Sequence, residues 1–234
     1  MKKDELKEKN HSNDQAETPE ASPSSLKLKK WFPDLSDDQI ERLVIYLREL
    51  TRFNKSLNLV SPLTIKNAES VHVADCVYAA QYIRPQLDLS EPLYDFGSGN
   101  GCPGVLIAAL YPEVKVILID RDHRKMEFCK HVIHAMGLSN VEVQVKSVEE
   151  FQPASVKQAV ARGFAPLSKA LIKYRTKFPK GGKFFHMKGD GWANELASLP
   201  SQIFSHWTPS LIGKYKIPEN AAEMFVVLTE KIAD

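Results

Sequence analysis

The first part of the chain after residue 35 carries apolar residues at helical spacing. One apolar face of about four turns is formed by Ile40, Leu43, Val44, Leu47 and Leu50. Ser36 stands three residues before Gln39, which is the spacing of a capping box and predicts where this helix begins. A loop is expected over Asn54–Pro62, and a second helix around residues 68–83. The pattern therefore predicts a helical section ahead of the rest of the fold.

From Leu93 onward, short apolar runs alternate with helical patterns. Strands are expected at 93–96, 114–119, 141–145, 158–161 and 183–187. Helices are expected between them, over 105–110, 124–136 and 167–178. Alternating βα units of this length predict a parallel sheet with helices on both faces. The last stretch, KYKIPENAAEMFVVLTEK, instead predicts two strands joined as an antiparallel hairpin.

Composition divides the chain at two places. Residues 1–25 are charged and polar with almost no large apolar side chains, so we expect a disordered tail there. Residues 26–90 make up the helical section, which we expect to pack on an α/β core over residues 91–234. No run of about eighteen apolar residues occurs, so no membrane span is expected.

The cysteine content indicates the cellular compartment, whereas the net charge does not identify a binding partner. The formal net charge of +2 is too small to support or to exclude RNA binding. The 3 cysteines, Cys76, Cys102 and Cys129, are odd in number and widely spaced. This spacing fits reduced thiols and indicates neither a disulfide framework nor a zinc site. We therefore expect a cytoplasmic protein without a metal site.

The segment DFGSGNGCPG, residues 95–104, begins at the end of the first expected strand. Its four glycines leave most of its backbone without side chains. In an open α/β sheet, ligands bind beyond the carboxyl ends of the strands, where this loop lies. Gly99, Gly101 and Gly104 match the GxGxxG fingerprint of dinucleotide sites. Asp120 ends the next strand, 19 residues after Gly101, at the distance suited to ribose hydroxyls. Taken alone, these residues permit NAD.

Two further features favour S-adenosylmethionine over NAD. Asp95 ends the first strand, and a carboxylate facing the ligand repels a pyrophosphate but attracts an ammonium or sulfonium group. A terminal strand hairpin is typical of class I methyltransferases and is usually missing from dinucleotide-binding folds. Cys102 lies inside the loop without an adjacent activating base, so we expect a small wall residue near the adenosine rather than a nucleophile.

Several segments taken together resemble the glucose-inhibited division protein B family, which methylates N7 of a guanine in bacterial 16S ribosomal RNA. The resemblance runs from about Ser36 to Ile232. It implies a class I S-adenosylmethionine-dependent methyltransferase fold, Rossmann-like, with a mostly parallel sheet and a C-terminal antiparallel hairpin. The segments are RFNKSLNLVSP, HVADCV, DFGSGNGCPG, LIDRDHRKMEFC, SVEEF, ARGFAPL and MKG.

The resemblance also implies roles for individual residues. The cofactor's methionine and adenosine would be held by Gly97, Gly99, Gly101 and Cys102. Asp120 would accept hydrogen bonds from the ribose, while Val148 and Glu149 would border the adenine. Arg162, at the end of the fourth strand, would face both the cofactor and the reacting base and is the expected catalytic residue.

The chemistry makes modest demands on the chain. N7 of guanine carries an in-plane lone pair and no proton, so it can attack the methyl group without a general base. Catalysis then depends on proximity and alignment. The expected partner is 16S rRNA or the small ribosomal subunit, with an exposed base as in single-stranded RNA.

The candidates for binding the RNA substrate are Asn54, Asn58, His72 and Lys188. Lys188, beyond the fifth strand, is suited to a phosphate contact, as is Arg162. Asn54 and Asn58 flank an irregular loop, where forming turns is an equally good explanation. His72 and Asp75 lie three apart on one helix face, either as a buried structural pair or as part of the pocket.

Four positions depart from the family's usual pattern. Phe53 replaces a tryptophan, Cys76 a serine, Cys102 a larger apolar residue and Glu223 an arginine before the last strand. We expect these changes to affect RNA binding more than cofactor binding. A nicotinamide-dependent oxidoreductase and a non-catalytic rRNA-binding assembly factor remain as alternatives, and a monomer is the expected state.

Overall fold

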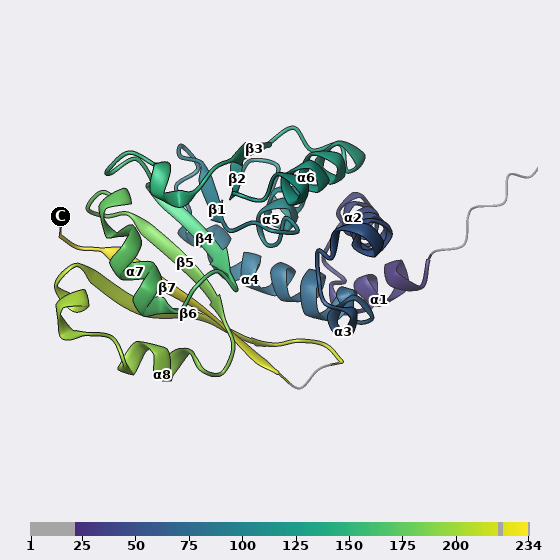
Figure 1. The fold of residues 1–234 in the computed structure, drawn as a ribbon. Coiled ribbons are helices and arrows are strands. Elements are labelled where there is room, and N and C mark those ends of the chain that lie inside the picture. The colour runs from purple at the N-terminus through teal and green to yellow at the C-terminus, as the bar shows by residue number, and fades with distance from the viewer. Residues whose placement is uncertain (1–21, 220–221, 234) are drawn as a thin grey trace, which may run out of the picture.

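A seven-stranded sheet organises the computed structural model, which describes residues 22–219 and 222–233. The strand order is β3-β2-β1-β4-β5-β7-β6. The bounds are β1 Leu93–Phe96, β2 Val116–Asp120, β3 Val141–Val145, β4 Gln158–Arg162, β5 Lys183–Lys188, β6 Trp207–Lys216 and β7 Glu223–Lys231. The first five strands pair in parallel, whereas β7 pairs antiparallel with both β5 and β6. The predicted mixed sheet with a terminal hairpin is confirmed (Figure 1).

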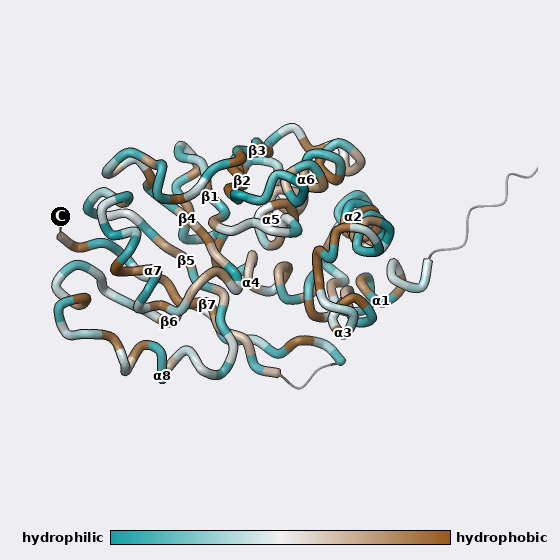
Figure 2. Tube along the Cα trace, in the orientation of Figure 1, coloured by the Kyte–Doolittle hydropathy of each residue, from teal (hydrophilic) through white to brown (hydrophobic). Residues whose placement is uncertain are grey.

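The helical section precedes the sheet and lies beside it, at the right of Figure 1. Its elements are α1 Pro23–Trp31, α2 Asp37–Leu57, α3 Pro62–Ile65, the π-helix η1 Glu69–Ala74, α4 Asp75–Ile83 and the 3-10 turn η2 Arg84–Gln86. The capping box is confirmed, because Gln39 N–H donates to Ser36 Oγ at 3.2 Å and Ser36 N–H donates to Gln39 Oε1 at 2.9 Å. Apolar and hydrophilic residues alternate along the turns of α2 (Figure 2).

The boundaries of this section differ from the prediction at three places. Helix α2 continues to Leu57, so Asn54 lies within the helix and not in the expected loop. The expected second helix is π-helical over its first turn and becomes α-helical only at Asp75. Helix α1 begins at Pro23, capped by Ser22, so regular structure starts before residue 26. Residues 1–21 of the expected tail lie outside the described residues.

Helices cover both faces of the sheet. They are α5 Gly104–Leu110, α6 His123–Ala135, α7 Leu167–Tyr174 and α8 Trp192–Ala197, with 3-10 turns at Val148–Glu150, Arg175–Lys177 and Ser201–Ser205. Helix α7 ends at Tyr174 instead of continuing to Phe178 as predicted, because the chain tightens into a 3-10 turn. Helix α8, between β5 and β6, was not predicted, since its six residues bury no apolar face. No helix in the described part of the chain is long and apolar enough to cross a membrane.

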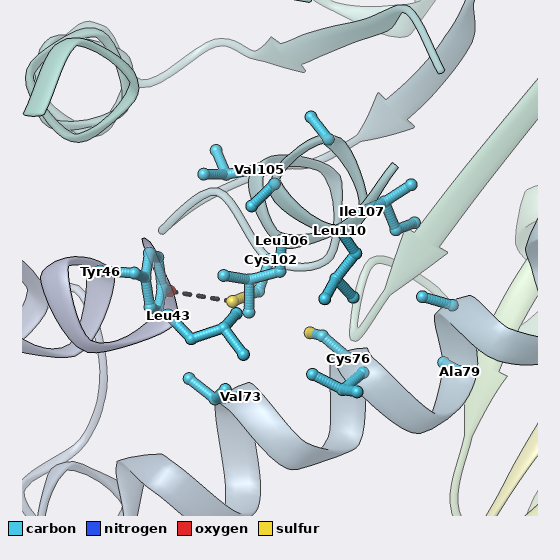
Figure 3. Packing of buried hydrophobic residues seen from close by; sticks show 14 of the residues in the cluster. Leu43, Tyr46, Val73, Cys76, Ala79, Cys102, Val105, Leu106, Ile107 and Leu110 are labelled. Carbon is cyan, nitrogen blue, oxygen red and sulfur yellow. Dashed lines mark hydrogen bonds between the residues drawn. The ribbon is translucent and has the colours of Figure 1, made fainter. Parts of the chain in front are cut away.

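The helical section shares one hydrophobic core with the sheet. Figure 3 shows Tyr46 of α2, Cys76 of α4 and Cys102 of the glycine loop pointing into the same space between α4 and α5. Tyr46 Oη lies 2.9 Å from Cys102 Sγ, and both side chains are buried. The three cysteines are free and buried. This packing fixes the helical section directly against the loop that follows β1.

The terminal hairpin is attached to the helical section as well. Ser70 Oγ donates to the carbonyl of Pro218, and Lys27 forms an ion pair with Glu219 at 3.2 Å. Tyr82 Oη of α4 donates to the carbonyl of Lys214 at 3.1 Å, beside the irregular pairing at Gly213. The β6–β7 hairpin is therefore held against the helical section by contacts from three of its residues.

We predict that Gly213→Ala destabilises the protein. A Cβ at Gly213 would lie 2.5 Å from Cγ and 3.0 Å from Cβ of Tyr82, which cannot move without shifting α4. We expect a loss of about 1–3 kcal/mol in the free energy of unfolding, measured by denaturant titration. Gly191→Ala is the matched control, because nothing lies within 4 Å of its added methyl group. Equal stability of the two variants would contradict the prediction.

Candidate functional site

The glycine loop between β1 and α5 requires glycine for two reasons. Gly97, Gly99 and Gly101 have φ values of 70°, 53° and 86°, which residues other than glycine rarely adopt. A Cβ on Gly97 would also lie 2.4 Å from the ring of Phe164. The loop therefore presents bare backbone at the carboxyl edge of the sheet, where a ligand can approach closely.

Asp120 holds this loop from the neighbouring strand. Gly99 N–H donates to its Oδ2 at 2.9 Å, and Asp122 N–H donates to its Oδ1 at 3.0 Å. Each carboxylate oxygen can accept a further hydrogen bond. Asp120 lines a cavity of about 560 Å³, whose other lining residues include Gly97, Val148, Glu149, Phe164 and Tyr174. We call this the first cavity. The carboxylate of Asp120 in its wall can accept hydrogen bonds from two neighbouring hydroxyl groups.

Glu149 lines the first cavity, but its carboxylate already has partners. It forms an ion pair with Lys173 and accepts a hydrogen bond from Ser147 Oγ. These contacts, that of Lys173 foremost, lower the pKa of Glu149 to about 2. Val148, next to it, is almost fully buried and gives this end of the cavity an apolar wall.

Two more cavities adjoin the first. The second cavity, of about 430 Å³, lies between the glycine loop and the helical section and is lined by Ser61, His72, Gly97, Gly99, Cys102, Lys125 and Arg162, among others. The third cavity, of about 750 Å³, is lined by Asp75, Arg162, Phe164, Lys188, Glu195 and Met224, among others. Gly163 lines all three cavities. The loop after β4 is therefore their meeting point.

Arg162 stands between the second and third cavities and joins β4 to the helical section. Its Nη1 donates to the Val71 carbonyl at 3.2 Å and to Asp75 Oδ2 at 3.3 Å, and its Nη2 donates to His72 Nδ1 at 3.0 Å. Burial opposes the charge of Arg162, but the buried groups around it, Asp75 among them, raise its pKa further above the ordinary value. The guanidinium is therefore a fixed positive charge in the wall of both cavities.

His72 is a neutral donor within this network. Its Nδ1 accepts from Arg162, so its Nε2 carries the proton. Burial, together with the charge of Arg162, lowers the pKa of His72 to about 4. Nε2 is buried and has no hydrogen-bond partner among the residues that the structure describes. Because His72 lines the second cavity, an acceptor bound there would satisfy this N–H group.

Asp95 lies beneath the glycine loop and lines none of the three cavities. It is fully buried, and its Oδ2 accepts from Gly104 N–H at 2.9 Å. Burial raises the pKa of Asp95 to about 7. Asp95 therefore ties the loop to the first turn of α5, and its expected contact with a ligand stays a prediction.

The other candidate residues divide into two groups. Cys102 and Lys188 line the second and third cavities, respectively. Asn54 and Asn58 line none of the three: Asn54 Oδ1 accepts from Val60 N–H at 2.8 Å, and Asn58 ends α2 in the left-handed conformation. Their contacts fit the turn-forming explanation. Gly101 also lines none of the three cavities; its position is enclosed by Val105 and Cys129, so it shapes the loop from within.

Two residues of the site escaped the sequence analysis. Phe164 separates the first cavity from the third, and its position inside ARGFAPL gave no signal beyond that segment. Glu195 lies on α8, which the apolar pattern did not predict. Within residues 22–219 and 222–233, no group of three histidine, cysteine or acidic residues is placed to hold a metal ion. The substituted Glu223 pairs with Lys214 at 3.0 Å.

We predict that Asp95→Asn changes how stability depends on pH. Between pH 3.8, the ordinary pKa of the carboxyl group, and about 7, folded Asp95 holds a proton that the unfolded chain has lost. Raising the pH across this range therefore destabilises the wild type relative to the variant, by about 1–3 kcal/mol. Denaturant titrations at pH 4.5, 6 and 7.5 measure the difference. Parallel profiles would contradict the prediction, whereas Asp34→Asn, at an exposed position, should follow the wild type.

Comparison with known proteins gives a consistent result. The family described as rRNA small subunit methyltransferase G matches residues 39–217. "Ribosomal RNA small subunit methyltransferase G 3" of Bdellovibrio bacteriovorus is 44% identical over 207 residues, covering 88% of this chain and 94% of that protein. "Ribosomal RNA small subunit methyltransferase G" of Hydrogenovibrio crunogenus is 33% identical over 182 residues, covering 75% and 82%.

Solved structures resemble the fold at low sequence identity. The tRNA methyltransferase TrmI from Aquifex aeolicus gives a TM-score of 0.51 at 16% identity and covers 69% of each chain. A protein from Agrobacterium tumefaciens, described as a predicted O-methyltransferase, gives 0.52 at 16% identity and covers 68% of this chain and 81% of that one. At this identity the likeness concerns the fold alone, and it is the class I methyltransferase fold.

Proposed function

Since this chain belongs to the rRNA small subunit methyltransferase G family, we propose that it methylates N7 of a guanine in 16S rRNA with S-adenosylmethionine as the methyl donor. The observation that carries the proposal is the meeting of three cavities at Gly163. Two of them flank the glycine loop and can hold the two ends of the cofactor. The third opens beside them and can hold the base.

The residues present fit the cofactor. Asp120 offers two acceptors for the ribose hydroxyls, and Val148 offers an apolar wall for the adenine. The second cavity is lined by Lys125 and by His72, whose buried Nε2–H has no partner among the described residues, so it suits the carboxylate of the methionine part. The bare backbone of Gly97 and Gly99 lies between the two, where side chains would block the approach.

The chain's own residues act by positioning. The bound cofactor supplies an electrophilic methyl group on a sulfonium. Arg162 fixes the wall between the second and third cavities, and Phe164 separates the first from the third. N7 has no proton to lose, so no residue is needed as a base, and alignment carries the rate enhancement. The base becomes cationic on methylation, and the charged residues that line the third cavity do not oppose it, because Asp75 offsets Arg162 and Glu195 offsets Lys188 there.

The alternatives gain no support from the site. A nicotinamide-dependent oxidoreductase needs a pyrophosphate site and a proton-transfer pair, whereas the family match and the hairpin favour methyl transfer. A non-catalytic assembly factor would not need an intact glycine loop. We also propose that the protein acts as a monomer in the cytoplasm, which light scattering and cell fractionation would test. The helical section is proposed to pack as part of the same unit as the core.

We predict that Asp120→Ala weakens S-adenosylmethionine binding about 10–100-fold in a calorimetric titration, because hydrogen bonds to a charged acceptor are lost. Glu127→Ala, which removes an exposed carboxylate on α6 outside all three cavities, is the matched control and should bind like the wild type. Equal affinity of the wild type and Asp120→Ala would remove Asp120 from the cofactor site. Binding of NAD(H) instead of S-adenosylmethionine would overturn the proposed function.

The product identifies the reaction. Small ribosomal subunits lacking the modification are incubated with the protein and S-adenosylmethionine, and the rRNA nucleosides are separated by chromatography and identified by mass spectrometry. We expect N7-methylguanosine as the methylated product. A different methylated nucleoside, or none with a cofactor-binding wild type, would contradict the proposed reaction.

A further inference from the structure

The third cavity is lined by an ion pair that the proposed reaction does not explain. It lies at the carboxyl ends of β4 and β5, separated from the first cavity by Phe164. Most of its wall is apolar, with Met187, Ile217 and Met224 among the lining residues. Lys188 and Glu195 line it as well and form an ion pair at 2.7 Å. Methyl transfer to N7 needs no charged pair at this position.

Backbone groups hold both side chains of the Lys188–Glu195 pair in place. Lys188 Nζ also donates to the Ala165 carbonyl at 3.0 Å, and Glu195 Oε2 also accepts from Leu167 N–H at 2.8 Å. An ammonium group has three N–H donors, so Lys188 keeps one in excess. Glu195 Oε1 has no hydrogen bond from any described residue. The pair, which lines the third cavity, therefore keeps one donor and one acceptor without a partner among the described residues.

The charge of Glu195 is kept at neutral pH. Burial by itself would raise the pKa of this carboxyl group, but the hydrogen bonds from Lys188 and from Leu167 N–H lower it below the ordinary value. The side chain is 34% exposed and that of Lys188 is 14% exposed, so both reach the cavity from a largely enclosed position. A phosphate is a poor occupant here, because the carboxylate would repel it.

We propose that Lys188 and Glu195 read the Watson–Crick edge of the target guanine, and this inference rests on the proposed function. Guanine presents O6, an acceptor, beside N1–H and the N2 amino group, which are donors. The free N–H of Lys188 matches O6, and Oε1 of Glu195 matches N1–H and N2–H. Adenine presents a donor and then an acceptor at the same positions, so it mismatches both side chains. The pair therefore selects guanine and leaves N7, on the other edge, for the methyl group.

Glu195→Gln tests the proposal with the smallest change in shape. The position of Oε2 receives two donors, so the amide oxygen must take it and the NH2 group must replace Oε1. That NH2 group then faces the N1–H of guanine, donor against donor. We expect kcat/KM on unmodified small subunits to fall about 10–100-fold, with calorimetric affinity for S-adenosylmethionine unchanged. Glu41→Gln, on the exposed face of α2, is the control and should match the wild type.

A second readout separates base recognition from a merely structural effect. Small subunits carrying adenine in place of the target guanine are offered to both enzymes. The NH2 group of Glu195→Gln can donate to N1 of adenine, so the ratio of guanine to adenine methylation should fall relative to the wild type. A structural defect would lower both rates together and leave the ratio unchanged, which would overturn the proposal.

The failures of the two proposals are distinguishable. If the wild type methylates guanine N7 and Glu195→Gln does so at the same rate, the inference about the pair is wrong while the proposed function stands. If the wild type binds S-adenosylmethionine but does not methylate the rRNA, the proposed function fails and this inference fails with it.

Discussion

The half-buried guanidinium of Arg162 makes the contacts on which the site depends. It extends from the end of β4 to a carbonyl, a carboxylate and an imidazole of the helical section. A half-buried charge of this kind is stabilised by the acceptors around it, so the contacts of Arg162 favour one relative position of β4 and the helices around Asp75. The second and third cavities share Arg162 as part of their walls, so its contacts hold one side of each cavity in place.

The electrostatics of the site divide its acidic residues into separate tasks. Asp95 is buried beneath the loop with a raised pKa and serves as a tie to α5. Asp120 keeps acceptors available at the wall of the first cavity, and Asp75 pairs with Arg162 and with Tyr215 Oη at 2.7 Å. The departures from the family pattern at Cys76 and Cys102 lie in the apolar packing behind this network (Figure 3). Neither thiol takes part in the hydrogen bonds of Arg162 to Val71, Asp75 and His72.

Much of the fold could be predicted because its signals are local. The strand at Leu93–Phe96, the capping box at Ser36 and the terminal hairpin all follow from nearest neighbours in the chain. The end of α2 could not be placed, since Asn58 ends it in the left-handed conformation, and neither this conformation nor the bond from Val60 N–H to Asn54 is encoded by periodicity. Glu195 could not be found either, because its role depends on Lys188 from a different element. Sequence patterns give the elements, whereas the pairing of side chains from distant elements needs the structure.

A double-mutant cycle between Arg162 and Asp75 tests the central claim most directly. The free energies of unfolding are measured for the wild type, Arg162→Lys, Asp75→Asn and the double variant. If the pair holds β4 to the helical section, the two effects are non-additive, with a coupling of about 1–3 kcal/mol. Effects that add within about 0.5 kcal/mol would show that the two residues act independently, and the account of the site built on Arg162 would be wrong.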